Sequence, residues 1–236
     1  MTDSVPWYVD SDHAFVFEMP TEQLAPLVPP PLQVVEPRPG VGLLWVSLLR
    51  FEGGNIDVLP TFHEITCEVV VHPRVADGEA RPDVAAFAVR TASDCAQFDD
   101  WARRVDRMPV VNCPGLRARV DRLHASCAVA DDRGPIFTLA SSASGVGWRD
   151  GLLRVQVFSH DSDGLWQGWV EWFGSYADHQ RPPHPDTRLA HHPFFGELDV
   201  GTARCVRQMY TAPSGTSVMK YYAPRQMRLT PSGGSR

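Results

Sequence analysis

Lysine is almost missing from this sequence: of its 22 basic residues, only Lys220 is not an arginine. Schiff-base chemistry needs a lysine amine, so a single side chain in 236 residues could supply it. The arginines form no basic run, and the formal net charge is −6. Nucleic acids and anionic membrane surfaces bind clustered positive charge, so the sequence predicts no partner of either kind.

Paired cysteines and long apolar segments are missing as well. The five cysteines are widely spaced without a CxxC pair, which argues against a disulfide framework and a zinc knuckle. No apolar run approaches the ~18 residues that cross a bilayer, and the N-terminal segment lacks the basic and apolar regions of a signal peptide. No GxSxG motif, phosphate loop or dinucleotide fingerprint occurs. We therefore expect a soluble, cytoplasmic protein.

What remains is an ordinary globular composition, with 43% apolar and 21% charged residues. The length suits one well-buried core, and no linker, repeat or low-complexity segment interrupts the chain. We predict a single domain over residues 1–236, with residues 229–236 as a frayed tail.

Most apolar segments have the length and the β-branched composition of strands. Strands are expected at 14–17, 41–51, 62–72, 83–91, 116–129, 135–144, 151–159, 202–210 and 218–229. Short helices are expected after residue 21 and over 95–105. Segment 164–179 is ambiguous, but its tryptophans recur every three residues and favour a helix. The pattern predicts an α+β protein that is mainly antiparallel β.

The order of these segments resembles the acetoacetate-decarboxylase-like superfamily, in particular an uncharacterised bacterial branch that lacks the catalytic lysine. The resemblance covers most of residues 7–210. It is carried by the order and spacing of the motifs LPTFHEITCEVVVHP, FAVRT, WARRVDRMPVV, VEWFGSY (a short helix in the family) and AHHPFF. It implies a cone-like antiparallel β-barrel with a central cavity open at one end, and assembly into a homo-oligomer.

The sequence departs from the family pattern at two residues that matter for the chemistry. Acetoacetate decarboxylases carry their catalytic lysine directly after the proline that corresponds to Pro109, and Val110 occupies that position here. The arginine that the family places before the first strand is also missing, and Asp10 and Asp12 lie there instead. Valine cannot form an iminium, so ordinary acetoacetate decarboxylase activity is not expected.

Three residues are candidate catalytic groups. Glu64 matches a family glutamate that faces the cavity; it could be a general acid or base with a raised pKa, or a strand-end carboxylate paired with an arginine. Arg90 could hold a substrate carboxylate by a bidentate contact, or pair with a protein carboxylate. His124 could be a base if it shares an inward strand face with Arg122; the alternative is a solvated outer face.

Several other residues are candidate substrate contacts. Val110 and Arg122 are expected to line the cavity, as are the aromatic Trp169 and two residues of the late family motifs, Tyr176 and His192; core packing is the alternative reading of the tryptophans. The histidines match no ligand spacing, so no metal or other cofactor is predicted. Lys220 lies in an amphipathic segment, which favours a surface lysine over a Schiff base.

Two functions remain open. The first is a small-molecule enzyme with non-covalent acid–base chemistry, a lyase or cyclase that acts on a keto acid or a natural-product intermediate. The second is a binding protein that keeps the cavity and has lost the chemistry, which the missing lysine supports directly. Fold alone does not separate them.

Overall fold

The computed structural model describes residues 4–52, 59–75, 78–121, 124–141, 148–180, 184–211 and 217–227. The predicted frayed tail lies outside these residues. The strands are β1 Ser4–Pro20, β2 Val41–Phe51, β3 Phe62–Val70, β4 Val84–Ser93, β5 Arg117–Asp121, β6 Ser126–Asp131, β7 Gly134–Ala140, β8 Arg149–Asp161, β9 Gly164–His179, β10 Arg188–Leu189, β11 Arg204–Thr211 and β12 Ser217–Gln226. The helices are α1 Thr21–Leu24 and α2 Ala96–Arg104, with 3-10 turns η1 Ala25–Leu27, η2 Pro193–Phe195 and η3 Val200–Thr202.

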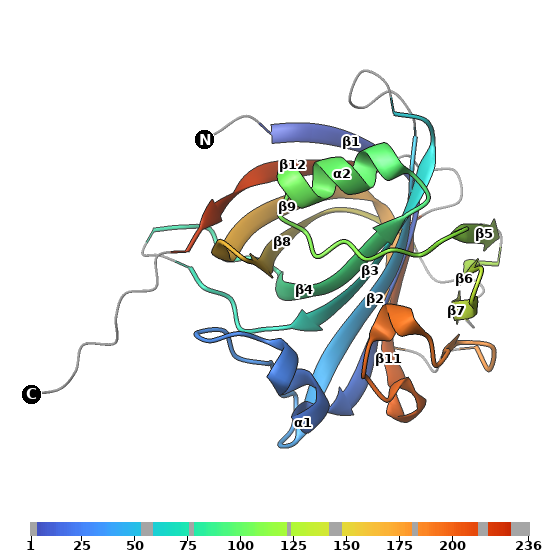
Figure 1. Ribbon diagram of the computed structural model, residues 1–236, viewed down its shortest axis with the longest axis horizontal. Coiled ribbons are helices and arrows are strands. Elements are labelled where there is room, and N and C mark those ends of the chain that lie inside the picture. Colours follow the sequence, from blue (N-terminus) through green and yellow to red (C-terminus); the bar gives the residue numbers. More distant parts are fainter. Residues whose placement is uncertain are drawn as a thin grey trace, which may run out of the picture.

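The larger of the two sheets has eight strands and curls until its edges meet. Strand pairing runs β1–β2–β3–β4–β8–β9–β12 and returns to β1, which closes a ring of seven strands (Figure 1). β11 pairs with both β1 and β9, as β12 does, and so extends the sheet beyond the end of β12. The ring has an inner face and an outer face, and side chains alternate between them along each strand.

One pairing departs from the predicted antiparallel pattern. β4 and β8 are parallel, whereas all other strand pairs of the described chain are antiparallel. The chain leaves β4 through α2 and the strands β5, β6 and β7 before it returns as β8. Parallel neighbours need such a long crossover connection.

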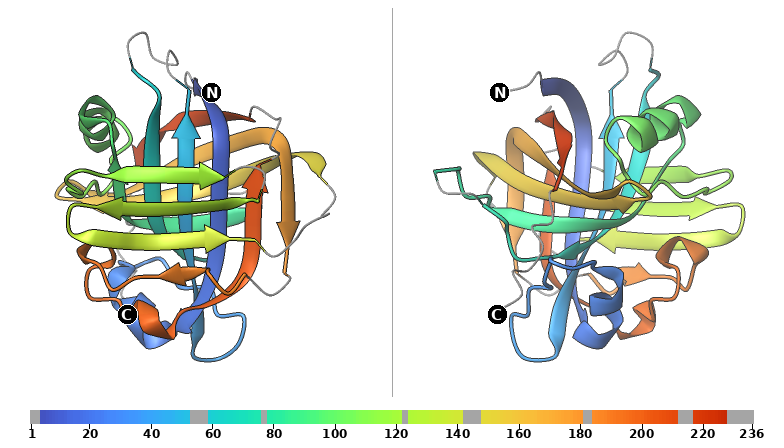
Figure 2. Two further views of the ribbon diagram at one scale, coloured as in Figure 1. Left: turned by 90° about the vertical axis from the view of Figure 1, so that its right-hand side faces the viewer. Right: turned by 60° about the vertical axis from the view of Figure 1, so that its left-hand side comes forward.

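A second, four-stranded sheet crosses the outer face of the ring in the order β10–β7–β6–β5 (Figure 2). Apolar residues from both sheets form the core between them, including Phe15, Ile65, Val129 and Phe137. The single strand predicted over 116–129 is wrong. β5 ends at Asp121 and β6 begins at Ser126, and the two pair antiparallel.

The helix α2 covers one end of the ring, and α1 lies near the other end (Figure 1). Beneath α2, the indole of Trp7 makes edge contacts with the rings of Phe51, Phe62, Phe98 and Trp101 at 5.3–6.1 Å between centroids. Such T-shaped pairs are favourable beyond the area that they bury. This aromatic cluster fills the α2 end of the ring.

The helix expected over 164–179 is also wrong, because this segment is the strand β9, paired with β8 along its length. In a strand, a spacing of three residues places successive tryptophans on opposite faces. Trp172 is therefore buried on the inner face, while Trp169 lies on the outer face. Pairing with β8 outweighed a local pattern that fits a helix equally well.

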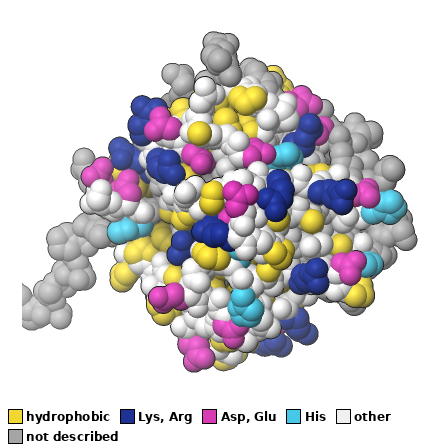
Figure 3. All heavy atoms as spheres, turned by 45° about the vertical axis from the view of Figure 1, so that its right-hand side comes forward, with side chains coloured by type: hydrophobic (Ala, Val, Ile, Leu, Met, Phe, Trp, Pro, Cys, Tyr) yellow, Lys and Arg dark blue, Asp and Glu magenta, His cyan; other side chains and the backbone are white. Residues whose placement is uncertain are grey.

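The surface in Figure 3 carries acidic and basic side chains in close alternation, without a broad field of one sign. Of the helices in the described ranges, none has the length and apolar character needed to cross a membrane.

Candidate functional site

The inner face of the ring lines a cavity of about 60 Å³. β1, β2, β3, β8, β9, β11 and β12 all contribute to its wall, which is mostly apolar. The polar side chains in the wall are Asp12, Ser47, Thr66, Glu68 and Tyr221. No lysine, arginine or histidine is among the described residues that line this deep cavity.

The deep cavity continues into a wider one of about 390 Å³ at the end of the ring away from α2. The two share Ala14, Trp45, Leu153 and Met209 in their walls. The wider cavity contains an arginine, Arg207, but Asp178 already binds it through two hydrogen bonds of 2.8 and 2.7 Å. A small molecule that enters through the wider cavity therefore meets an arginine whose charge Asp178 already balances.

Asp12 reaches the deep cavity because of a bulge in β1. Val9 pairs with Phe51 of β2, but Ser11 pairs with Arg50, so Asp10 is an extra residue. A bulge of this kind switches which side chains face inward. The Oδ1 atom of Asp12 is buried and makes no hydrogen bond within the described chain. Burial, with a smaller effect of Glu68, raises the pKa of Asp12 to about 8.

Glu64, Thr66 and Glu68 alternate along the inner face of β3. The hydroxyls of Thr66 and Ser47 are hydrogen-bonded at 2.6 Å. Burial raises the pKa of Glu68 to about 7. The pKa of Glu64 lies well above its ordinary value because of burial first, and then because of Asp106 and other acids. Its Oε2 has no partner among the described residues.

Two further groups complete this acidic interior. Burial raises the pKa of Asp106, which follows α2, to about 8. The pKa of the Tyr221 hydroxyl is raised by burial and then by Glu64 and Asp106, so it remains a proton donor at neutral pH. A small cavity of about 20 Å³ joins Asp106 to Tyr221, Val157 and Val170 of the deep cavity wall.

No described residue on the inner face supplies an amine in place of the catalytic lysine of the decarboxylases. Val110 packs against the inner core beside α2. Lys220 lies on β12 between Met219 and Tyr221, which face the deep cavity, so its own side chain is on the outer face. There the Lys220 Nζ atom is 5.1 Å from the centroid of the Phe173 ring.

Two predicted site residues lie on the far side of the wall. Arg90 pairs in register with Cys67, which belongs to the core between the sheets, so Arg90 does not share the face of Glu64. A Cβ on Gly196 would come within 2.5 Å of its guanidinium. Arg90 was predicted to contact a ligand in the cavity, but its side chain lies on the opposite face of the wall.

His192 is buried at the start of η2. Its Nδ1 accepts a hydrogen bond from the Phe194 amide at 3.1 Å, so its Nε2 donates to Asp131 at 2.9 Å. Arg133 binds the second oxygen of Asp131 through its Nε at 2.9 Å. Burial alone would raise the pKa of Asp131, but these bonds lower it to about 2. This network joins the second sheet to η2 and is not part of the cavity.

The remaining predicted residues are scattered. His124 is exposed in the turn between β5 and β6, 2.7 Å from Asp121, and Arg122 lies outside the described residues. His124 is therefore not on an inward strand face, and the expectation for Arg122 falls outside the described residues. Tyr176 is buried in the inner core, stacked on Trp172 at 5.3 Å between ring centroids.

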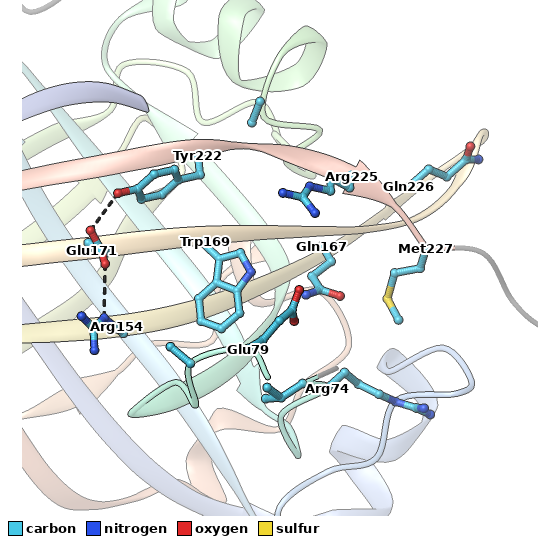
Figure 4. Close-up of a pocket in the computed structure, with 13 residues that line it drawn as sticks. Arg74, Glu79, Arg154, Gln167, Trp169, Glu171, Tyr222, Arg225, Gln226 and Met227 are labelled. Atoms are coloured by element: carbon cyan, nitrogen blue, oxygen red, sulfur yellow. Dashed lines mark hydrogen bonds and ion pairs between the residues drawn. The ribbon is translucent and has the colours of Figure 1, made fainter. Parts of the chain in front are cut away.

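Trp169 lines a different pocket, of about 570 Å³, on the outer face of β8, β9 and β12 (Figure 4). Glu171 in this pocket accepts hydrogen bonds from Arg154 at 3.2 Å and from Tyr222 at 2.8 Å. Trp169 was expected to line the central cavity, and this placement is wrong, because residues of odd number in this part of β9 face outward.

Glu68, Asp106 and Tyr221 were not predicted from the sequence. The even spacing of Glu64, Thr66 and Glu68 in a strand was a usable signal for Glu68. No local signal marks Asp106 or Tyr221, because their position depends on α2 and on the closure of the ring. Among the described residues, no group of three or more His, Cys, Asp or Glu side chains could hold a metal ion.

No protein-family model and no curated protein matches this chain. Solved structures match in fold. An acetoacetate decarboxylase superimposes with a TM-score of 0.63 at 13% identity, covering 95% of this chain and 91% of that chain. The acetoacetate decarboxylase of Legionella pneumophila gives 0.60 at 12% identity, with coverage of 94% and 87%.

A third match is the enduracididine biosynthesis enzyme MppR, complexed with the condensation product of pyruvate and imidazole 4-carboxaldehyde. It gives a TM-score of 0.51 at 10% identity, with coverage of 95% and 90%. The chain therefore has the acetoacetate decarboxylase-like fold.

Proposed function

We propose that the protein is a small-molecule enzyme that uses non-covalent acid–base chemistry inside the ring, without a Schiff-base lysine. Its reaction class is a lyase or cyclase reaction on a keto acid or a natural-product intermediate with a carbonyl group. The supporting observation is the set of buried carboxyl groups on the inner face, Asp12, Glu64 and Glu68, with no cationic side chain in the described wall of the deep cavity. Buried acids of this kind cluster at functional sites.

The proposed chemistry uses two acids in different protonation states. In the proposal Glu64, whose pKa burial holds well above its ordinary value, is the protonated acid that donates a proton to a carbonyl oxygen. Glu68, with a pKa of about 7, can accept the proton from the carbon next to that carbonyl. The Tyr221 hydroxyl can donate a hydrogen bond to the developing enol oxygen. When the substrate has a hydroxyl on the β-carbon, the enol returns its proton to Glu64, the C–O bond breaks, and the proton held by Glu68 leaves with the hydroxyl as water. When it has a second carbonyl carbon within reach, the enol carbon forms a bond to that carbon, and the Glu68 proton goes to the new alkoxide, so no bond to the protein is needed.

Within this proposal, the natural-product intermediate is favoured over a keto acid held by its carboxylate. Arg90 lies on the opposite face of the wall from Glu64, and Arg207 is already bound by Asp178. A substrate carboxylate would enter an acidic cavity without a counter-charge, which is energetically costly.

Deuterium exchange at the carbon next to the carbonyl of 2-butanone, followed by NMR, tests the proposed chemistry. The wild-type chain should accelerate exchange, and Glu64→Gln should slow it by about 10²-fold or more, the usual contribution of general acid–base catalysis. The control is Glu197→Gln, an exposed carboxylate in the loop after η2, which should keep the wild-type rate. Equal rates for wild type, Glu64→Gln and buffer would refute the proposal.

The second candidate is a binding protein without turnover. It is supported by the apolar Val110 at the position of the decarboxylase lysine. This candidate predicts saturable binding of carbonyl compounds in the cavity, with no acceleration of exchange in the wild-type chain.

The proposal includes a cytoplasmic homo-oligomer built from a single domain over residues 1–236, and its chemistry needs no cofactor. The resemblance in motif order supports the assembly. Analytical ultracentrifugation of the full chain tests it, and a monomer at micromolar concentration would contradict it.

A further inference from the structure

We propose that the deep cavity binds a compact organic amine, or the amine end of a larger molecule, through the carboxyl group of Asp12. This inference rests on the proposed function only in that it concerns the same cavity. It names the substrate class: a basic nitrogen compound rather than a carboxylic acid.

The unpartnered oxygen of Asp12 is the first reason. Asp12 is 4% exposed and lines the cavity, yet its Oδ1 makes no hydrogen bond within the described chain. Buried polar atoms of native proteins nearly always have a partner. The cavity of about 60 Å³ has room for a small group, because a single water molecule needs only about 10–15 Å³. A ligand donor at Oδ1 would satisfy this atom.

The charge of the wall determines the kind of donor. Glu68 faces the same cavity, and its charge acts on Asp12. An anionic ligand would bury a further negative charge beside them. An amine instead takes the proton of the carboxylic acid, and the resulting ammonium–carboxylate pair carries no net charge into the interior.

The apolar wall fits the remainder of such a ligand. The indoles of Trp45 and Trp172 both line the cavity, and the face of an indole attracts an ammonium group. The Nε1 atom of Trp172 is buried and has no hydrogen-bond acceptor within the described chain. A carbonyl or hydroxyl oxygen on the same ligand would accept from it, so an amino ketone or an amino alcohol fits both orphaned atoms.

The cavity should release a proton when an amine binds. The titratable groups that act electrostatically on Asp12 or Glu68 from the inner face are Glu64 from β3 and Tyr221 from β12. Asp99 of α2 and Asp106 of the following loop act on Glu64, and the thiols of Cys67 and Cys127 lie on the other side of the wall. All are acids, so none supplies a counter-ion. Below the raised pKa of Asp12 the acid is protonated, and binding of an ammonium ion displaces that proton. Affinity for an amine should therefore increase with pH up to about 8.

Titration calorimetry of the full chain with n-butylamine, 1-butanol and propionate tests the inference, because the three probes are matched in size. Butylamine should bind at least about tenfold more tightly than propionate, a difference of about 1.4 kcal/mol. Its affinity should increase by up to about tenfold per pH unit below pH 8, with about one proton released. Asp12→Asn should remove both the preference and the pH dependence. Asp132→Asn, which changes an exposed acid in the turn between β6 and β7, should retain them.

Three results would overturn the inference: propionate binding at least as tightly as butylamine, butanol matching butylamine at every pH, or no probe binding at all. The wild-type pH series decides the question even if Asp12→Asn fails to fold. The calorimetry involves no turnover, so its outcome is independent of the deuterium-exchange test. Amine binding without exchange would refute the proposed function alone, and exchange without amine binding would refute this inference alone.

Discussion

Thr91 and Val110 are held side by side by backbone hydrogen bonds, from Thr91 N to Pro109 O at 3.1 Å and from Val111 N to Thr91 O at 2.8 Å. Thr91 pairs with Thr66, a residue of the deep cavity wall. The segment after α2 is thus attached to the inner wall of the ring, and the residue that it places there is an apolar one.

Val110→Lys should introduce Schiff-base chemistry at this place. The new amine would lie beside the inner core, and treatment with 2-butanone and borohydride should leave a reduced adduct at position 110, mapped by mass spectrometry. Nearby carboxylates favour the ammonium form, so the adduct should increase at alkaline pH. The matched control Val110→Met and the wild-type chain should remain unlabelled. An adduct at Lys220 in the wild-type chain would contradict its placement on the outer face.

Stability should decrease as the pH increases from about 6 to 8. Burial raises the pKa of Asp12 to about 8, so the folded state keeps a proton that the unfolded chain has already released near its ordinary value of 3.8. The stabilisation is complete below that ordinary value and is lost as the pH rises through the folded pKa. Over two pH units this corresponds to about 2–3 kcal/mol.

Urea unfolding at pH 6 and 8 measures this change in the free energy of unfolding. Asp12→Asn, which cannot ionise, should show a smaller change than wild type. Asp131 does not contribute in this range, because its pKa is about 2. If the free energy of unfolding changes equally between pH 6 and 8 in the wild type and in the variant, Asp12 is already ionised in the folded protein at pH 6.

His192→Ala should destabilise the fold by about 1–3 kcal/mol, because it removes a buried ring and one of the two donors to Oδ1 of Asp131, leaving only the Arg133 amide at 2.7 Å. The His192 side chain is 2% exposed, whereas the adjacent His191 side chain is 76% exposed. His191→Ala is therefore a matched control and should change stability by less than about 0.5 kcal/mol. Chemical denaturation separates the two variants. If His192→Ala weakens ligand binding without loss of stability, the residue belongs to a ligand site after all.

The positions of most strands could be predicted from the sequence because their signals are local. Segments 41–51 and 62–72 are apolar or β-branched and are bounded by turn residues, and both are strands. The signal fails where two structures share one pattern, as in β9, or where the alternating pattern of a strand continues across a break between two strands, as between β5 and β6.

The candidate site was predictable only in part. Glu64 is buried on the strand where it was expected, with His63 turned outward to Asp94 at 2.8 Å. The faces of Arg90 and His124 could not be predicted, because each depends on register against another strand. A shift of one residue moves a side chain through the wall.

By itself, the amino-acid sequence determined that this protein is rich in strands, that only one amine is available and that valine follows Pro109, because these are properties of composition and local order. Only the tertiary structure decided that Asp12 faces the cavity with Glu68 and Tyr221. One extra residue, Asp10, shifts the register of β1 against β2, and pairing of β1 with β12 closes the ring. Both effects depend on contacts between segments far apart in the chain, which no local pattern records.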